Sequence, residues 1–187
     1  MRRPEGARDF LLKQMPKQSV CAEIGVYKGD FAARIMRIVQ PQKLHLIDPW
    51  KYEPSATYGE SLYGGETGAS QANMDSIFDG VLRRFHRQIT TEVVRVYRSD
   101  SVDASAAFPD DYFDWIYIDG NHQYEFVKRD LEAYYPKVKQ GGYLTGDDYG
   151  VFGWWQDGVK RAVDEFISKA LIEVLQMKGH QFCLRKK

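Results

Sequence analysis

Short apolar runs recur along the chain, and most of them close with a glycine or an aspartate. They occupy residues 19–26, 43–50, 92–100, 113–120 and 141–148. Their length and their content of β-branched and aromatic residues predict buried strands. Two further runs, 171–177 and 180–185, are so close together that they must pair as an antiparallel hairpin, with a turn at Lys178 and Gly179.

The segments between the first five runs show the spacing of amphipathic helices, and Asp30 is the predicted cap of the first helix. The apolar stripes are Phe31, Ile35 and Ile38; Met74, Ile77, Phe78, Val81, Leu82 and Phe85; Val127, Leu131 and Tyr134; and Val159, Ala162, Val163, Phe166 and Ile167. Alternating strands and helices predict an α/β fold, a Rossmann-like three-layer sandwich with a mostly parallel seven-stranded sheet and a C-terminal antiparallel hairpin. We expect a single domain over residues 1–187, with ligands at the carboxyl ends of the strands.

One long segment, from Pro49 to Ala72, shows no such period. Its residues 50–70 hold four glycines and three tyrosines. So long an irregular segment inside a compact domain is typically functional. We therefore predict that residues 53–72 form a lid or substrate loop, mobile over 54–70 without ligand and ordered over a bound cofactor. A disordered insertion is the alternative.

Composition narrows the class of protein. Lys and Arg (26) balance Asp and Glu (26), which gives no electrostatic reason to expect nucleic acid or an anionic membrane as a partner. No window approaches the roughly 18 apolar residues of a membrane span. We expect a soluble, cytoplasmic protein that acts on a small molecule, and the sequence leaves a homo-oligomer open. Cys21 and Cys183, the two cysteines, are expected to be reduced core thiols.

Carboxylates end two neighbouring strands. Asp119 closes the run 113–120, the pair Asp147 and Asp148 closes the run 141–148, and His122 follows Asp119 by three positions. Carboxylates that converge at one sheet edge repel one another unless a cation neutralises them. An all-oxygen ligand set suits a hard divalent ion, Mg²⁺ before Mn²⁺ or Ca²⁺. The alternative is a solvated acidic turn, with His122 a polar residue at a helix N-terminus.

The first strand runs into a glycine-containing turn that reads Glu23-x-Gly25-x-x-x-Gly29. Glycines let the backbone approach a ligand closely, although such turns also occur for steric reasons alone. The turn lacks the GxGxxG spacing that favours a dinucleotide.

The second and third strands end in further polar residues. Asp48 can accept hydrogen bonds from ribose hydroxyls, or it can cap a turn. Asp100 and Ser101 can meet an adenine edge, or they can form the turn after the third strand.

Taken together, these strand ends resemble the class I S-adenosylmethionine-dependent methyltransferases over nearly the whole chain. In that family the turn after the first strand holds the methionine end of the cofactor, the acid after the second holds the ribose, and an acid–serine pair after the third reaches the adenine. The corresponding residues are Glu23, Gly25, Tyr27 and Gly29, then Asp48, then Asp100 and Ser101. The family's antiparallel final strand matches the predicted hairpin.

Within that class, residues 118–150 resemble the Mg²⁺-dependent small-molecule O-methyltransferases of the macrocin and mycinamicin type, a methyltransferase 24-like family. The resemblance implies that Asp119, Asp147 and Asp148 bind Mg²⁺ and that Asp119 and His122 are catalytic. Residues 53–72 match no loop of these relatives, so the identity of the substrate does not carry over.

The chemistry of these residues leads to the same function. A hydroxyl beside a divalent ion loses its proton more readily, and His122 can accept that proton. We therefore predict an S-adenosylmethionine-dependent, Mg²⁺-assisted O-methyltransferase that acts on a hydroxyl of a sugar or natural product. The rivals are a metal-independent methyltransferase and a non-catalytic S-adenosylmethionine- or nucleotide-binding protein of the same fold.

Aromatic residues follow the acidic pair at Phe152, Trp154 and Trp155. We expect one tryptophan to pack the last helix against the sheet and the other to contact the substrate. His45 lies in the middle of a strand, where we expect a core histidine.

Overall fold

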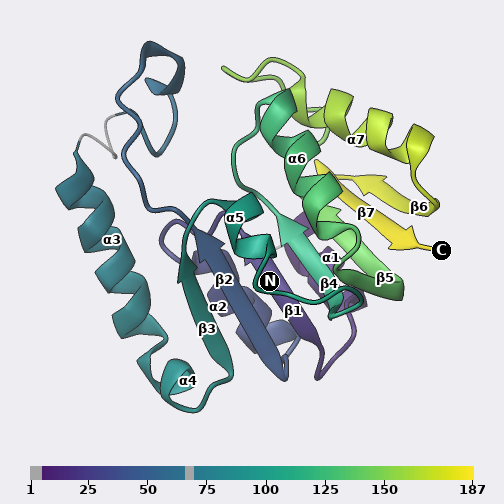
Figure 1. Ribbon diagram of the computed structural model, residues 1–187, viewed down its shortest axis with the longest axis horizontal. Helices are drawn as coiled ribbons and strands as arrows, with labels where there is room; N and C mark the ends of the chain where they lie inside the picture. The colour runs from purple at the N-terminus through teal and green to yellow at the C-terminus, as the bar shows by residue number, and fades with distance from the viewer. Residues whose placement is uncertain (1–5, 66–69) are drawn as a thin grey trace, which may run out of the picture.

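The computed structural model describes residues 6–65 and 70–187, and within them seven strands form one sheet (Figure 1). The strands are β1 (Val20–Ile24), β2 (Lys43–Asp48), β3 (Val94–Arg98), β4 (Phe113–Ile118), β5 (Val138–Gly146), β6 (Ile172–Lys178) and β7 (Gln181–Lys186). Their order across the sheet is β3-β2-β1-β4-β5-β7-β6. The pairings among β1 to β5 are parallel, and β7 is antiparallel to both β5 and β6. The predicted fold class is confirmed.

Helices cover both faces of this sheet (Figure 1). They are α1 (Ala7–Gln14), α2 (Asp30–Ile38), α3 (Gln71–Arg84), α4 (His86–Thr90), α5 (Ser101–Ser105), α6 (Tyr124–Tyr134) and α7 (Gly158–Lys169). The helices α1, α2 and α3 share one core layer with Trp115 and Tyr117 of β4. The helices α5, α6 and α7 share the other layer with Ile116 and Ile118. Alternate residues of one strand thus serve opposite faces, which makes three layers.

The parallel register brings the carboxyl ends of β1, β4 and β5 side by side. The backbone N–H of Asp119 donates to the carbonyl of Ile24 (2.7 Å), and that of Asp147 donates to the carbonyl of Ile118 (3.2 Å). Strand-like hydrogen bonding therefore continues to the first residue after β4 and β5. As a result, the acids that close the two strands start from neighbouring positions on one edge.

The C-terminal hairpin turns one residue later than the sequence predicted. Lys178 pairs with Gln181, so the two central residues of the turn are Gly179 and His180. Both have positive φ, 59° and 65°. This is the backbone of a type I′ turn, whose twist matches that of the flanking strands. The predicted turn at Lys178 was wrong because the apolar pattern locates the strands but not the residues that take positive φ.

Some helices differ from the predicted set. The helices α1, α4 and α5 were not predicted; α4 and α5 have five residues each, too few to show a period. In α1 the residues Leu11 and Leu12 are buried but Phe10 is exposed, which blurs the apolar stripe. The predicted cap of α2 was also wrong, since Asp30 is its first helical residue and Gly29, with φ of 74°, is the N-cap.

The predicted lid, residues 53–72, is described in part. Residues 66–69 lie outside the described residues, and 71–72 begin α3. Residues 53–65 fold back on themselves around a short 3₁₀ helix, Ala56–Tyr58. The backbone N–H of Glu53 donates to the carbonyl of Tyr63 (3.0 Å) at the base of this fold. A lid that closes over a ligand stays a prediction.

Smaller predictions about the interior agree with the structure. Cys21 and Cys183 are free, buried thiols. His45 is buried, with one ring nitrogen 3.2 Å from the Tyr97 hydroxyl and the other 3.2 Å from the Tyr112 hydroxyl. Burial lowers the pKa of His45 to about 4, so it is a neutral core histidine. Among the described residues, no helix is long and apolar enough to cross a membrane.

Candidate active site

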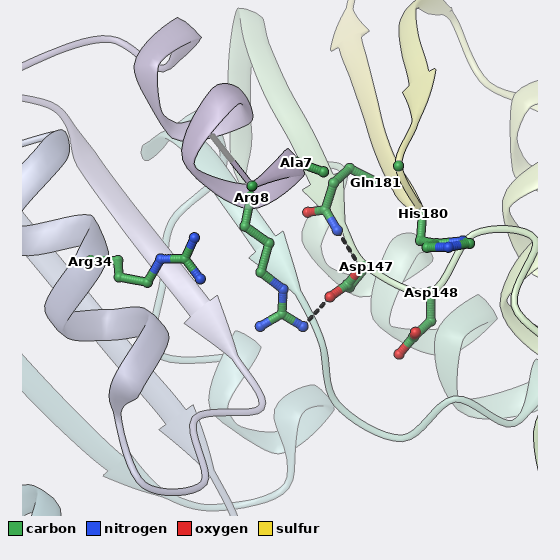
Figure 2. Close-up of a pocket in the computed structure, with 9 residues that line it drawn as sticks. Ala7, Arg8, Arg34, Asp147, Asp148, His180 and Gln181 are labelled. Atoms are coloured by element: carbon green, nitrogen blue, oxygen red, sulfur yellow. Dashed lines mark hydrogen bonds and ion pairs between the residues drawn. The ribbon is translucent and has the colours of Figure 1, made fainter. Parts of the chain in front are cut away.

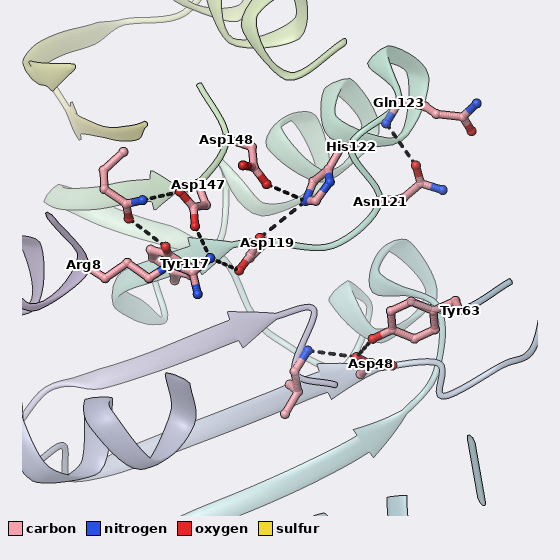
Figure 3. Close-up of polar contacts among 12 residues, drawn as sticks. Arg8, Asp48, Tyr63, Tyr117, Asp119, Asn121, His122, Gln123, Asp147 and Asp148 are labelled. Atoms are coloured by element: carbon pink, nitrogen blue, oxygen red, sulfur yellow. Dashed lines mark hydrogen bonds and ion pairs between the residues drawn. The ribbon is translucent and has the colours of Figure 1, made fainter. Parts of the chain in front are cut away.

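Three of the predicted site residues converge at the ends of β4 and β5 (Figure 3). The Nε2 atom of His122 lies 3.4 Å from Oδ1 of Asp119 and 3.2 Å from Oδ2 of Asp148. One ligand atom from each of the three residues lies within 4.8 Å of the others. Asp148 has a positive φ of 58°, a conformation that is uncommon for a residue with a side chain and is often found at functional sites. The structure thus brings together an imidazole and two carboxylates that can share one cation.

Asp147 lies at the same edge but has other partners (Figure 3). Its Oδ2 forms an ion pair with Nη2 of Arg8, which lies 3.0 Å from Oδ2 of Asp119. Its Oδ1 accepts from the side-chain amide of Gln181, whose own oxygen accepts from the Tyr117 hydroxyl (2.7 Å). The predicted third metal ligand is therefore already neutralised by a residue of α1. Arg8 and Gln181 were not among the predicted site residues.

The electrostatics of this edge follow from its crowded charges. Burial raises the pKa of Asp148, and the carboxylates of Asp147 and Asp119 raise it further although His122 opposes them. Burial by itself lowers the pKa of His122, but the hydrogen bond and charge of Asp119, with the charges of Asp148 and Asp147, outweigh it and raise this pKa. Burial also acts to lower the pKa of Arg8, whereas Asp119 leads the groups that raise it overall. The carboxylates thus stabilise the protonated forms of His122 and Arg8.

The turn after β1 lies against the same acids. Gly25 has a φ of 86°, and a Cβ atom built on it would lie 2.0 Å from the carbonyl oxygen of Asp119. Only glycine fits there. Glu23 is buried, and its Oε2 accepts no hydrogen bond from any residue that the structure describes. Burial, and then the charge of Asp119, raises the pKa of Glu23. Such an orphaned carboxylate oxygen fits the cationic group of a bound ligand.

Asp48 is buried at the end of β2 and is held by the turn itself. Its Oδ2 accepts from the backbone N–H groups of Val26 (2.8 Å) and Tyr27 (2.9 Å), and its Oδ1 accepts from that of Trp50 (2.7 Å). The hydroxyl of Tyr63, from the predicted lid, also donates to Oδ2 (Figure 3). Burial still raises the pKa of Asp48, because it outweighs these four hydrogen bonds. The predicted ribose acceptor thus has four donors from the protein itself.

The third strand end forms a local polar cluster. Asp100 caps α5, because its Oδ1 accepts from the backbone N–H of Val102 (3.0 Å). The hydroxyl of Ser101 donates to Asp130, a buried residue of α6. Burial raises the pKa of Asp130 to about 7, against the effect of the Ser101 hydrogen bond. Asp130 was not predicted as a polar residue of this region.

Aromatic residues line the side of the site that faces the predicted lid. The ring of Trp155 lies 4.6 Å from that of His122, and Trp155 packs against the core layer of α6 and α7. The ring of Trp154 lies 5.2 Å from that of Tyr58. The Tyr58 hydroxyl donates to Gln123 (3.0 Å). This arrangement agrees with one tryptophan in the core and leaves Trp154 on the lid side.

Comparison with known proteins places this chain in a family. A family model described as a methyltransferase domain matches residues 22–149. The chain belongs to this family and is a class I S-adenosylmethionine-dependent methyltransferase.

The individual proteins that match this chain do so at low sequence identity or over a short segment. The O-methyltransferase NovP matches with a TM-score of 0.66 and 23% identity over 96% of this chain and 79% of that chain. An O-methyltransferase from Bacillus cereus, solved with SAH, matches with a TM-score of 0.62 and 15% identity over the same shares, 96% and 79%. The uncharacterised protein R132 of Acanthamoeba polyphaga mimivirus is 46% identical over 41 residues, which make up 22% of this chain and 19% of that protein.

Proposed function

We propose that this methyltransferase transfers the methyl group of S-adenosylmethionine to a hydroxyl oxygen of a small molecule, such as a sugar or natural product, with the assistance of Mg²⁺, or of Mn²⁺ or Ca²⁺ in its place. The convergence of Asp119, Asp148 and His122 beside the turn after β1 carries this proposal. Gly25 approaches the carbonyl of Asp119 closely, so a methyl donor held by this turn would lie near an acceptor held by the acids. A transfer between two bound reactants requires such proximity.

The cofactor supplies the reactive methyl group, and the ends of the first three strands would hold it. The proposed contacts are Glu23, Gly25, Tyr27 and Gly29 at the methionine end, Asp48 at the ribose, and Asp100 and Ser101 at the adenine. The strongest support is the buried, unpaired Oε2 of Glu23, which fits the amino group of the methionine end.

The divalent ion would be held by Asp119 and Asp148, whereas Asp147, which the sequence also predicted as a ligand, is the ion-pair partner of Arg8. A set of one or two carboxylates completed by water is the usual environment of protein-bound Mg²⁺. The ion would supply positive charge that favours loss of a proton from the acceptor hydroxyl. The neutral imidazole of His122 would accept that proton, and the carboxylates of Asp119 and Asp148, 3.4 Å and 3.2 Å from Nε2, would stabilise the charged ring that results.

The acceptor would bind between these acids and the lid, residues 53–72. Tyr58 supports this placement, because its hydroxyl accepts from Asn121 (2.9 Å) and donates to Gln123, on either side of His122. Phe152 and Trp154 lie on the same connection after β5, and Phe152 is strongly exposed. Exposed aromatic rings suit stacking on a planar or sugar ring.

Thermal melting tests the cofactor assignment. The purified protein is heated with S-adenosylmethionine, S-adenosylhomocysteine, NAD or ATP, each with and without Mg²⁺. A ligand that binds the native state raises the melting temperature by mass action. We expect only the two methionine derivatives to do so, and equal effects of all four ligands would contradict the proposal. Methyl transfer to a panel of sugars and catechols, with and without EDTA, then separates the metal-independent and the non-catalytic rivals.

A further inference from the structure

Arg8 occupies the position of a cation between two carboxylates. A single Nη2 atom contacts Oδ2 of Asp119 and Oδ2 of Asp147, although these residues follow different strands. The other oxygen of Asp119 points toward His122 on the opposite side. The acidic edge therefore has two parts. Arg8 neutralises Asp147 and one oxygen of Asp119, whereas the other oxygen of Asp119 and the carboxylate of Asp148 lie near His122.

Packing holds the guanidinium in this place. It lies 5.3 Å from the centre of the Phe31 ring and 6.0 Å from that of Tyr117, on the same side of the sheet. The helix that carries it is anchored by Leu11 and Leu12, which are fully buried. The start of this helix also packs tightly against the hairpin turn, where a Cβ on Gly179 would lie 2.5 Å from the Cβ of Ala7. Arg8 is thus a fixed part of the fold.

A shallow, open pocket of about 310 Å³ lies beside Arg8 and the two acids that follow β5 (Figure 2). Arg34 of α2 lines the same pocket. Its Nε donates to Asp9 (2.8 Å), so it is neutralised by a residue of α1. The two arginines therefore share a compartment but serve different carboxylates, which makes Arg34 a matched reference for Arg8.

We propose that Arg8 is the resident cation of the acidic edge: it keeps Asp147 as its own ion-pair partner and restricts the divalent ion to Asp119 and Asp148. This inference rests on the proposed function, because it concerns the same ion. Asp147 supports it, since both of its carboxylate oxygens already have partners, Arg8 and Gln181. Arg8 is accordingly a positioning residue that sets how tightly the ion is bound.

The proposal has a direct electrostatic consequence. Replacing Arg8 by glutamine frees Asp147 to act as a ligand and removes a positive charge that repels the ion. Both effects strengthen binding. Even with the full screening of water, a unit charge a few ångströms from a divalent ion changes its affinity by about tenfold. Two variants are controls. Arg8→Lys keeps the positive charge, and Arg34→Gln removes an equal charge from a side chain that pairs with Asp9.

Calorimetric titration of the full chain with MnCl₂, without cofactor, measures this effect in the wild type, Arg8→Gln, Arg8→Lys and Arg34→Gln. We expect Arg8→Gln to bind Mn²⁺ about tenfold more tightly than the wild type, and the other two variants to match the wild type. Equal or weaker binding by Arg8→Gln overturns the proposal. An equal gain in Arg34→Gln also overturns it, because the effect would then be one of net charge.

The same titration separates this proposal from the proposed function. If the wild type binds no ion but Arg8→Gln does, the role of Arg8 stands and metal assistance in the native protein fails. If neither binds, both fail. Should Arg8→Gln not fold, Asp147→Asn and Asp148→Asn decide the matter with Arg8 in place. We expect Asp148→Asn to lose far more affinity than Asp147→Asn, and equal losses would overturn the proposal.

Discussion

The carboxylates at the end of β2 and those after β4 and β5 differ in how their charge is compensated. Asp48, the last residue of β2, accepts from three backbone N–H groups and the Tyr63 hydroxyl, so the fold itself satisfies it. The acids after β4 and β5 face one another instead, with Arg8 and His122 as their charged partners. A carboxylate that backbone N–H groups satisfy can shape a turn, whereas carboxylates that repel one another are stabilised by nearby positive charge.

The largest expected effect tests the half of the site that faces His122. If His122 is the general base, His122→Ala should lower turnover by about 10² to 10⁴-fold. Its affinity for Mn²⁺ should hold, because the carboxylates of Asp119 and Asp148 remain, and excess Mg²⁺ should not restore activity. Turnover and Mn²⁺ titration are measured on the same preparation.

Two results of that experiment would point elsewhere. A parallel loss of Mn²⁺ affinity would make His122 a ligand, which its position within 4.8 Å of both carboxylates allows. Full activity of His122→Ala would leave the proton to an aspartate or to solvent. Asp148→Asn serves as the reference, because it removes a charged ligand and should be partly rescued by excess metal.

Asp130 extends the comparison to a buried acid with few donors. Its pKa is raised to about 7, so the folded state favours the neutral carboxyl. In the unfolded chain Asp130 ionises near the ordinary value of 3.8, so its contribution to stability is fully present below about pH 4 and is lost as pH rises through about 7. Each pKa unit corresponds to about 1.4 kcal/mol, which bounds the loss at about 4 kcal/mol.

Asp130→Asn should remove this part of the pH dependence. The amide cannot ionise but can still accept from Ser101, so the variant should be more stable than the wild type at pH 8 and similar at pH 4. Urea unfolding at the two pH values measures the difference. A wild type that is as stable at pH 8 as Asp130→Asn would show that the buried carboxyl is better solvated or paired than its single hydrogen bond from Ser101 indicates.

The sequence predicted features that leave a local pattern. The strands and longer helices were found because their apolar residues repeat, and the acids because they directly follow strands. Arg8 left no such signal. Its partners, Asp119 and Asp147, are 111 and 139 positions away in the sequence, and the helix that carries it shows no regular apolar spacing. Asp130 did leave one: it lies between Val127 and Leu131 on the buried face of α6. An acid inside an apolar stripe can be recognised from the sequence.

The remaining part of the site depends on an aperiodic segment. Tyr63 and Tyr58 lie in the predicted lid, where no repeat indicates which side chain turns inward. The structure shows that Tyr63 reaches Asp48 while Tyr58 reaches residues 121 and 123. These contacts depend on how the loop folds back between β2 and α3, and neighbouring residues do not determine that path.

The smallest expected effect tests whether the Tyr63 hydroxyl competes with the cofactor ribose for Asp48. Its hydroxyl donates to Asp48, and the ribose hydroxyls would need the same carboxylate. Tyr63→Phe removes that competing donor but keeps the ring, which lies 5.9 Å from that of Tyr27. A neutral hydrogen bond is worth about 0.5 to 1.5 kcal/mol and one to a charged group somewhat more, so S-adenosylhomocysteine should bind at least about twofold more tightly.

Calorimetry on the wild type, Tyr63→Phe and Tyr58→Phe measures this gain. Tyr58→Phe is the control, because it loses contacts of the same loop at residues 121 and 123 and leaves Asp48 unchanged. Proteolysis within residues 54–65, with and without S-adenosylhomocysteine, reports whether the loop closes as predicted. Weaker binding by Tyr63→Phe would place its hydroxyl among the contacts of a closed lid. Unchanged binding would instead show that Asp48 only supports the turn. If Asp48 does not bind the ribose, removing the Tyr63 hydroxyl cannot change the affinity for the cofactor.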